Sequence, residues 1–225
     1  MWNRELDSTE RAELYNAGGV AFDDPHFRGL LKQQYDIHGI AGEIYNFYSS
    51  ARFQINTLFA SALEHIAGPD TTWFGEIGMR LLDSVDGLEH RIHASLDVND
   101  PNGEFKFTID DEELAIGGVW KHADLIIKRK DKDTFIVSNS DISFTIQHQF
   151  HEQINHFDFI DASISAKGRF ETQPHGLWGQ TWQNKWYHDL TEDGLPYFLE
   201  GDSLKDYEVE DGIFGNDFKF NKYFS

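Results

Sequence analysis

Apolar and polar residues alternate with a period of two along most of the chain after residue 23, a pattern typical of strands that bury one face. In residues 90–96 and 104–109 every second side chain is apolar. Further segments rich in aromatic and β-branched residues are 35–38, 44–48, 53–59, 72–81, 123–128, 134–138, 142–150 and 157–166. Turn residues at 131–133 and 138–140 separate some of them. The pattern predicts a mainly β fold, an antiparallel β-sandwich or a barrel-like domain.

Two glycines lie inside one of the predicted strands. Gly75 and Gly78 both fall within residues 72–81. A glycine in a strand leaves a gap on the pleated surface, which is typical of a β-bulge or of a close approach by another backbone. We expect one or both of these features in this strand.

Both ends of the chain depart from the alternating pattern. Residues 2–19 are predicted to form a short N-terminal helix, which Asp7 or Ser8 can cap and the glycines at 18–19 can end. The acidic segment 192–217 is irregular and is expected to wrap around the β domain. Its apolar anchors would be Tyr207, Ile213, Phe214, Phe218 and Phe220.

The composition excludes several classes of function. The chain has 225 residues, with 39 acidic and 19 basic side chains and a formal net charge of −20. This charge repels phosphate backbones and anionic membrane surfaces, so neither nucleic acid nor a membrane is an expected partner. A large acidic surplus most often forms a solubilising surface; cation binding and a salty environment are the alternatives. With no cysteine there are no disulfides, zinc–thiolate sites or thiol catalysis.

No targeting or membrane-spanning segment is expected either. No apolar run reaches the 18 or so residues of a membrane span. The first residues, 1–7, lack the apolar core of a secretory signal.

The segment 174–182 combines a glycine-rich turn with two indoles. Gly176 and Gly179 flank Leu177 and Trp178, a spacing that suits a tight turn with two large apolar side chains directed inward. The favoured interpretation is that this turn packs into the hydrophobic core. The alternative rests on Trp178, Trp182 and Trp186, whose spacing of four places them on one helix face or in an aromatic platform for a sugar or base.

Several short motifs resemble a known family when their order along the chain is considered. The run Asp24-Pro25-His26-Phe27 resembles the opening of von Willebrand factor type D domains and of the related root-cap-type domains. The run Gly176-Leu177-Trp178-Gly179 resembles their closing Gly-Leu-Cys-Gly signature, with Trp178 in place of the cysteine. Supporting positions are Tyr35, His38, Gly39, Gly42, Tyr45, Ser49, Asp206, Tyr207, Phe214 and 218–221.

The resemblance implies two parts. A von Willebrand type D-like β domain would cover residues 23–225, and an N-terminal helical arm residues 1–22. The beginning of that arm, from Trp2 to Asn16, is similar to the C-terminal end of concanavalin A-like (laminin G-like) lectin domains. Because the rest of such a domain is absent, we expect a piece of a longer protein or a remnant used as an arm.

The resemblance also raises calcium, which type D domains commonly bind. The positions that would supply ligands are occupied by Leu31, Lys32 and Gln180, and neither leucine nor lysine suits a hard cation. Other oxygen donors follow at Asn184, Asp189, Glu192 and Asp193. We therefore predict no cofactor and no metal ligands, with a displaced calcium site as the alternative.

Candidate chemistry is sparse elsewhere. The histidines that lie closest together in sequence or follow the glycine-rich turn are His148, His151, His156, His175 and His188. In a strand His148 and His151 point to opposite faces, which disfavours a shared metal. Carboxylate pairs such as Asp110 with Asp111 and Asp158 with Asp161 fit solvated turns better than a hydrolytic site. We predict no catalytic residues.

These observations lead to a non-enzymatic structural or adhesive module of a virion or extracellular surface assembly. Its partners would be other proteins or copies of itself, as a homo-oligomer. The alternative is a carbohydrate-binding protein that stacks sugars on Trp73, Trp178, Trp182 and Trp186. A calcium-dependent adhesion domain is a third, weaker interpretation.

Overall fold

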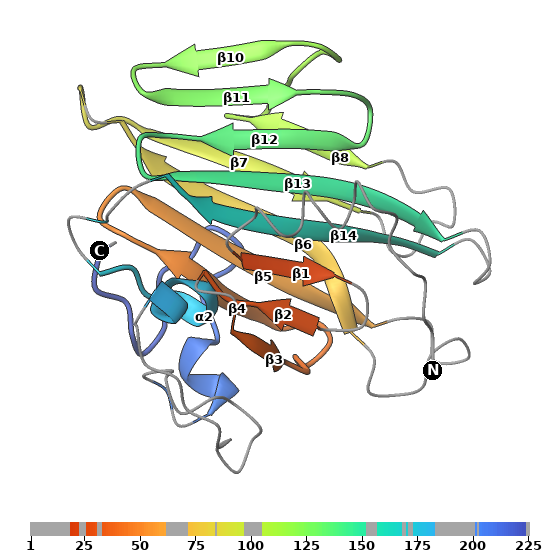
Figure 1. The fold of residues 1–225 in the computed structure, drawn as a ribbon, viewed down its shortest axis with the longest axis vertical. Coiled ribbons are helices and arrows are strands. Elements are labelled where there is room, and N and C mark those ends of the chain that lie inside the picture. The colour runs from red at the N-terminus through yellow and green to blue at the C-terminus, as the bar shows by residue number, and fades with distance from the viewer. Residues whose placement is uncertain are drawn as a thin grey trace.

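The computed structural model describes residues 19–22, 26–30, 33–61, 72–83, 85–96, 105–151, 157–167, 170, 173–182, 201 and 203–223. In these residues the fold is mainly β, and its strands form one hydrogen-bonded antiparallel sheet that curls strongly (Figure 1). Among the described residues, no helix has the length and apolar character needed to cross a membrane.

The sheet has two arms that meet at one point. The first arm runs through hairpins in the order β10 (Val119–His122), β11 (Leu125–Arg129), β12 (Thr134–Ser138), β13 (Ile142–His151) and β14 (Phe157–Ala166), and continues from β14 into β1 (Gly19–Phe22), β2 (His26–Arg28) and β3 (Gln34–Asp36). The second arm consists of β4 (Ile44–Ser49), β5 (Phe53–Ser61), β6 (Thr72–Leu82), β7 (Glu89–Ser95), β8 (Lys106–Ile109) and β9 (Glu112–Glu113). Ile160 of β14 pairs with Phe74 of β6 and joins the arms.

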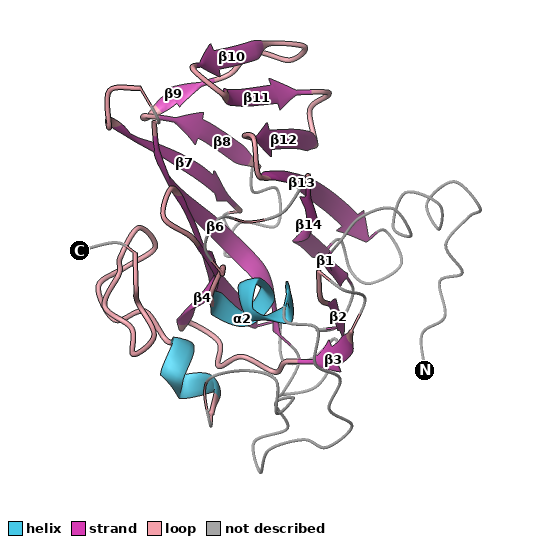
Figure 2. Cartoon of the chain, turned by 60° about the vertical axis from the view of Figure 1, so that its left-hand side comes forward, coloured by secondary structure: helices cyan, strands magenta, loops and turns pink. Residues whose placement is uncertain are grey.

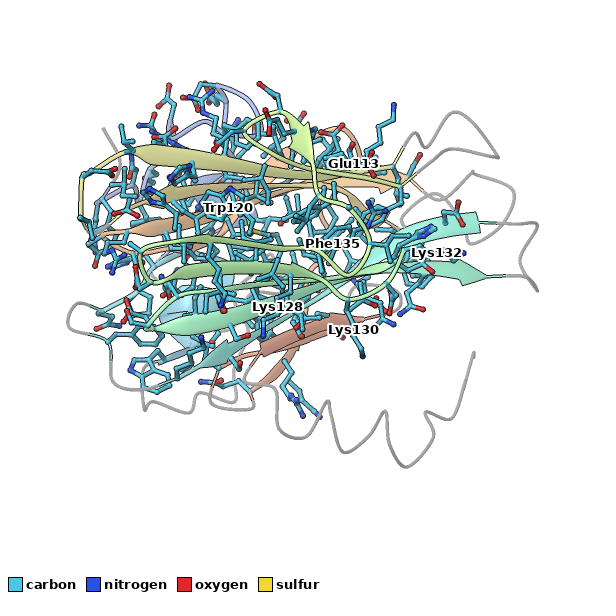
Figure 3. All side chains as sticks on the ribbon, turned by 90° about the horizontal axis from the view of Figure 1, so that it is seen from above. Glu113, Trp120, Lys128, Lys130, Lys132 and Phe135 are labelled. Atoms are coloured by element: carbon cyan, nitrogen blue, oxygen red, sulfur yellow. The ribbon has the colours of Figure 1, made fainter. Side chains whose placement is uncertain are left out.

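The curl places the two arms face to face as layers. Figure 3 looks into the space between them, where Trp120 of β10 and Phe135 of β12 lie. Phe135 stacks on Phe107 of β8 with ring centroids 3.8 Å apart, a contact between the two layers. The strands therefore behave as a half-barrel whose side chains interdigitate.

An aromatic cluster fills the other end of the core. Phe47, Phe74 and Trp178 are buried, and the ring of Phe47 lies 5.1 Å from that of Phe74 and 5.2 Å from that of Trp178. Edge-to-face contacts of this kind add about 0.5–1.5 kcal/mol per pair to the burial of the rings. This packing is available without cysteine.

The mainly β architecture predicted from the alternation is confirmed. Each predicted strand corresponds to an observed strand within a few residues. Ala123 is an exception, because it lies in the turn between β10 and β11 with a φ of 46°. The short strands β1, β2, β9 and β10 were not predicted.

The two strand glycines have the predicted roles. Gly75 is the extra residue of a bulge, since Leu58 pairs with Glu76 while Phe59 pairs with Phe74. At Gly78 an added Cβ would lie 2.6 Å from the carbonyl oxygen of Ile213, so the tail backbone approaches β6 closely there.

The C-terminal segment wraps the edge of β4, as expected. Its backbone pairs with the strand through Tyr45 and Glu208, and the Val209 amide donates to the Ile44 carbonyl at 2.8 Å. Tyr207 at the end of the 3-10 helix η2 (Leu204–Tyr207) is fully buried. Figure 2 shows this tail beside β4.

The helix of the described chain lies near its C-terminal end. It is the single turn α2 (Gly176–Gly179), followed directly by the 3-10 helix η1 (Gln180–Trp182). The helix predicted for residues 2–19 lies almost entirely outside the described residues, apart from Gly19, which belongs to β1.

Candidate functional site

The predicted turn at residues 176–179 is a helical turn packed into the core. Gly176 has a φ of 87°, and an added Cβ would lie 2.5 Å from Asn46 Oδ1 and 2.7 Å from the Tyr48 amide nitrogen. No larger residue fits without moving β4. Leu177, Trp178 and the flanking glycines are all buried. Trp178 therefore fits the core interpretation of this motif.

The opening and closing motifs of the resemblance meet in the structure. His26 and Phe27 belong to β2, and Phe27 contacts Trp178 with ring centroids 6.2 Å apart. The Tyr35 hydroxyl donates to the Leu177 carbonyl at 3.0 Å. Asp24 and Pro25 lie outside the described residues.

The position considered for calcium has a packing role instead. Gln180 is fully buried and donates from Nε2 to the Tyr207 hydroxyl at 2.5 Å. Its neighbour Thr181 accepts from the Leu30 amide at 2.7 Å, and the Thr181 carbonyl accepts from Gln33 at 2.6 Å. The other donors considered, Asn184, Asp189, Glu192 and Asp193, and the positions 31–32 lie outside the described residues.

The structure describes three of the four indoles proposed for sugar stacking. Trp178 is fully buried. Trp73 is half-buried against Phe159, with centroids 4.7 Å apart, and Trp182 is half-buried against Phe170 at 4.9 Å. Trp186 lies outside the described residues.

The histidine of β13 is part of a carboxylate network. His148 Nδ1 lies 2.9 Å from Asp133 and its Nε2 lies 3.5 Å from Asp158, while its ring stacks on Phe105. His151 also belongs to β13, but its side chain lies outside the described part of the structure, so the expected opposite orientation of His148 and His151 stays a prediction. His156 and His188 lie outside the described residues.

The curled sheet brings together a different group of titratable side chains, from the end of β6, the beginning of β7 and the terminal strand β10. Asp83, directly after β6, His90 of β7 and His122 of β10 each offer a ligand atom, and these atoms lie within 4.8 Å of one another. Asp83 Oδ2 is 2.5 Å from His122 Nδ1. The Asp83 side chain has no exposed surface.

The buried carboxylate also organises the turn between β6 and β7. Asp83 Oδ1 accepts from the amides of Val85 at 2.5 Å and Asp86 at 3.3 Å. The hydrogen bond from Val85 is the main reason that the pKa of Asp83 is below its ordinary value, and the contact with His122 acts in the same direction. Asp83 is therefore a fixed anion beside two imidazoles.

His90 is oriented by a second carboxylate. Its Nδ1 lies 2.7 Å from Asp110 Oδ2, while its Nε2 is buried and has no hydrogen-bond partner within the described part of the chain. The His90 ring is 5.0 Å from that of His122 and 4.9 Å from that of Trp120. The arrangement is a half-buried group of one carboxylate and two imidazoles beside the Trp120 indole.

Sequence reasoning missed this group because its three residues come from three separate strands or strand ends. The signal that existed is the alternation in β10, where Trp120 and His122 are half-buried and Val119 and Lys121 are exposed. Asp110 was considered only as part of a solvated turn.

No family model matches this chain, and no curated protein is significantly similar to it. The resemblance to von Willebrand type D and lectin domains therefore stays a prediction, and the functional argument rests on the geometry.

Proposed function

We propose that this chain is a non-enzymatic structural or adhesive module that acts by assembly, with copies of itself as the first partners. The supporting observation is a strip of four lysines on a strongly acidic chain. This basic strip consists of Lys121, Lys128, Lys130 and Lys132, all exposed. A chain with a net charge of −20 offers an acidic surface to which such a strip is complementary.

Strand register sets the geometry of the basic strip. Lys128 of β11 pairs with Val119 of β10, and Ile126 of β11 pairs with Lys121 of β10. Lys121 and Lys128 therefore share the outer face of the layer with Val119 and Ile126. Lys130 and Lys132 follow in the turn between β11 and β12 (Figure 3). The intervening Trp120 and Ile127 face the opposite layer.

Most of the strip is not neutralised within the fold. Lys132 lies 3.5 Å from Asp133. Within the described ranges, no carboxylate lies within ion-pairing distance of Lys121, Lys128 or Lys130. These charges are thus available to an acidic partner.

The end of the sheet also offers this partner exposed apolar side chains. Among the described strands β10 pairs with β11 alone, and Val119 and nearby Ile116 are 49% and 63% exposed. Lysines on an edge strand also prevent unwanted strand pairing. Charge reversal distinguishes the two roles. Replacing the lysines with glutamate should abolish assembly if they bind an acidic partner, but not if they only prevent strand pairing.

The test is the native mass as a function of concentration and salt, by analytical ultracentrifugation. We expect a concentration-dependent oligomer at low salt that dissociates at high salt, because salt screens exposed charges. Lys121→Glu with Lys128→Glu should abolish it, whereas Lys106→Glu with Lys205→Glu, an equal change at two other exposed lysines, should not. A monomer under all conditions, or an oligomer indifferent to the first pair, overturns the proposal.

The carbohydrate-binding alternative loses one of its four indoles. Stacking a sugar needs at least two exposed indoles, and Trp178 has no exposed surface. The virion or extracellular setting rests on the resemblance described above.

A further inference from the structure

We propose that Asp83, His90 and His122 form a binding site for a divalent transition-metal ion, for which Zn²⁺ is the best match. The donor set is one carboxylate and two imidazoles, with ligand atoms within 4.8 Å of one another. Imidazole nitrogen with carboxylate oxygen suits borderline ions such as Zn²⁺, and three protein ligands with one open position is a common zinc arrangement. This inference does not rest on the proposed assembly.

His90 is prepared for such a role. Asp110 occupies its Nδ1 at 2.7 Å, which leaves Nε2 as the atom that can bind. That atom is buried, and the described residues supply no partner for it. A buried polar atom without a partner is unfavourable and needs an explanation. A carboxylate on the far nitrogen is also the usual way in which metal-binding histidines are oriented.

Asp83 and His122 supply the other two ligands. They contact each other at 2.5 Å, and an ion bound between them would replace their shared hydrogen bond. Zn²⁺–ligand bonds of about 2.0–2.2 Å hold two ligand atoms of a tetrahedral site about 3.4 Å apart. The distance between Asp83 and His122 must therefore increase by roughly 1 Å. The largest distance among the three ligand atoms must decrease by a similar amount. The His122 side chain is 39% exposed and has room for this adjustment.

Further side chains favour a cation at this place. Asp86 Oδ2 lies 4.0 Å from His122 Nε2 and is able to complete the coordination, as is water. Asp110 adds a second carboxylate behind His90. Trp120 lies against both imidazole rings, at 4.9 Å from His90 and 6.0 Å from His122.

The ion would act as a staple between the layers. β10 is at one end of the strand order, and β6 and β7 lie in the opposite layer beyond the junction with β14. Coordination would join them directly in a chain that has no cysteine for disulfides. A metal that binds only the folded state raises stability.

The experiment uses the full chain, stripped with a chelator and titrated with ZnCl₂ by calorimetry, with the thermal midpoint measured with and without Zn²⁺. We expect one Zn²⁺ per chain and a higher midpoint. His90→Gln and His122→Gln should each weaken binding by more than 10-fold, and Asp110→Asn by about 10-fold, as for other partners that orient a metal ligand.

The matched control is His148→Gln, since His148 also lies beside two carboxylates but in a different part of the core. It should leave zinc affinity unchanged. If the His90→Gln variant does not fold, the test rests on the His122→Gln variant, because the His122 side chain is half-exposed. The visible spectrum of the Co²⁺-loaded wild type provides a second readout, with tetrahedral bands expected.

The competing explanation is a staple without a metal, made by the His122–Asp83 hydrogen bond and the packing of His90 against Trp120. In that case His122→Gln destabilises the metal-free protein while Zn²⁺ changes nothing. Absence of binding at millimolar Zn²⁺, or a zinc affinity in the His90→Gln and His122→Gln variants equal to that of the wild type, overturns the proposal.

Discussion

Arg129 of β11 donates to Glu113 of β9 at 2.6 Å, and this ion pair links the two layers at one end of the open edge. The same guanidinium donates to the Leu114 carbonyl at 2.8 Å and lies 5.1 Å from the centre of the Phe135 ring. At the other end of β10 the layers are linked by His122 and Asp83. On this side of the half-barrel, side chains thus link the two layers where the described strands do not pair.

The two partners of the Arg129–Glu113 ion pair should contribute unequally to stability. The Arg129 side chain is 11% exposed and the Glu113 side chain 66% exposed. Arg129→Ala should lower the free energy of unfolding by about 2 kcal/mol, because it removes a part-buried hydrogen bond to the Leu114 carbonyl and the packing on Phe135. Glu113→Gln should cost less than about 1 kcal/mol, as for surface ion pairs. Urea denaturation measures both, and equal losses would contradict this account.

Gly176 and Gly42 give a matched pair of substitutions. Both have φ near 90°, but an added Cβ at Gly42 meets nothing within 4 Å, whereas at Gly176 it collides with Asn46 and the backbone of β4. Gly42→Ala should cost about 1 kcal/mol from backbone strain alone. Gly176→Ala should cost about 3 kcal/mol or more, since β4 must also move. Chemical denaturation decides, and similar costs would mean that the helical turn relaxes freely.

Local pattern was enough to predict most strands, because alternation over residues such as 142–150 is written directly into the sequence. It failed for β9 and β10, where two to four residues between turns show too little of the period. The contact between Phe27 and Trp178 was not predicted, because it joins residues that lie far apart in the chain.

The candidate metal site was beyond sequence reasoning for a different reason. Its geometry depends on the curl of the whole sheet, which is set by long-range pairing at Phe74 and Ile160. No spacing within the chain records that His122 and His90 become neighbours. For the histidines near one another in sequence, His148 and His151, the spacing alone predicts opposite faces of one strand.

Alkaline pH should unfold the protein through its buried tyrosines. Burial raises the pKa of Tyr35, Tyr45 and Tyr48, chiefly because the phenolate is desolvated. An unfolded tyrosine titrates near pH 10. Since the folded pKa values are higher, their contribution to stability is complete below about pH 10 and is lost as the pH rises further.

The measurement is tyrosinate absorbance alongside circular dichroism in an alkaline titration. A fraction of the eight tyrosines should ionise only together with the loss of β signal. The same titration in urea provides the reference for freely exposed groups. Complete ionisation near pH 10 with the β signal intact would contradict the burial of these phenols.

Acid pH should reveal the contribution of Asp124, which links the turn after β10 to Arg52 before β5. Desolvation opposes its ionisation, but two hydrogen bonds from Arg52, at 2.6 and 3.2 Å, and one from the Ser140 amide bring the pKa to about 2. The contribution is present above the unfolded value near pH 4 and is lost as the pH falls through about 2. With the side chains of Arg52 and Asp124 partly exposed, at 27% and 29%, the contribution of Asp124 to the free energy of unfolding should be about 1 kcal/mol.

Asp124→Asn should therefore lower the free energy of unfolding at pH 7 and have little effect at pH 2, as measured by urea denaturation at both values. An equal loss at the two pH values would show that shape, and not charge, is what Asp124 supplies.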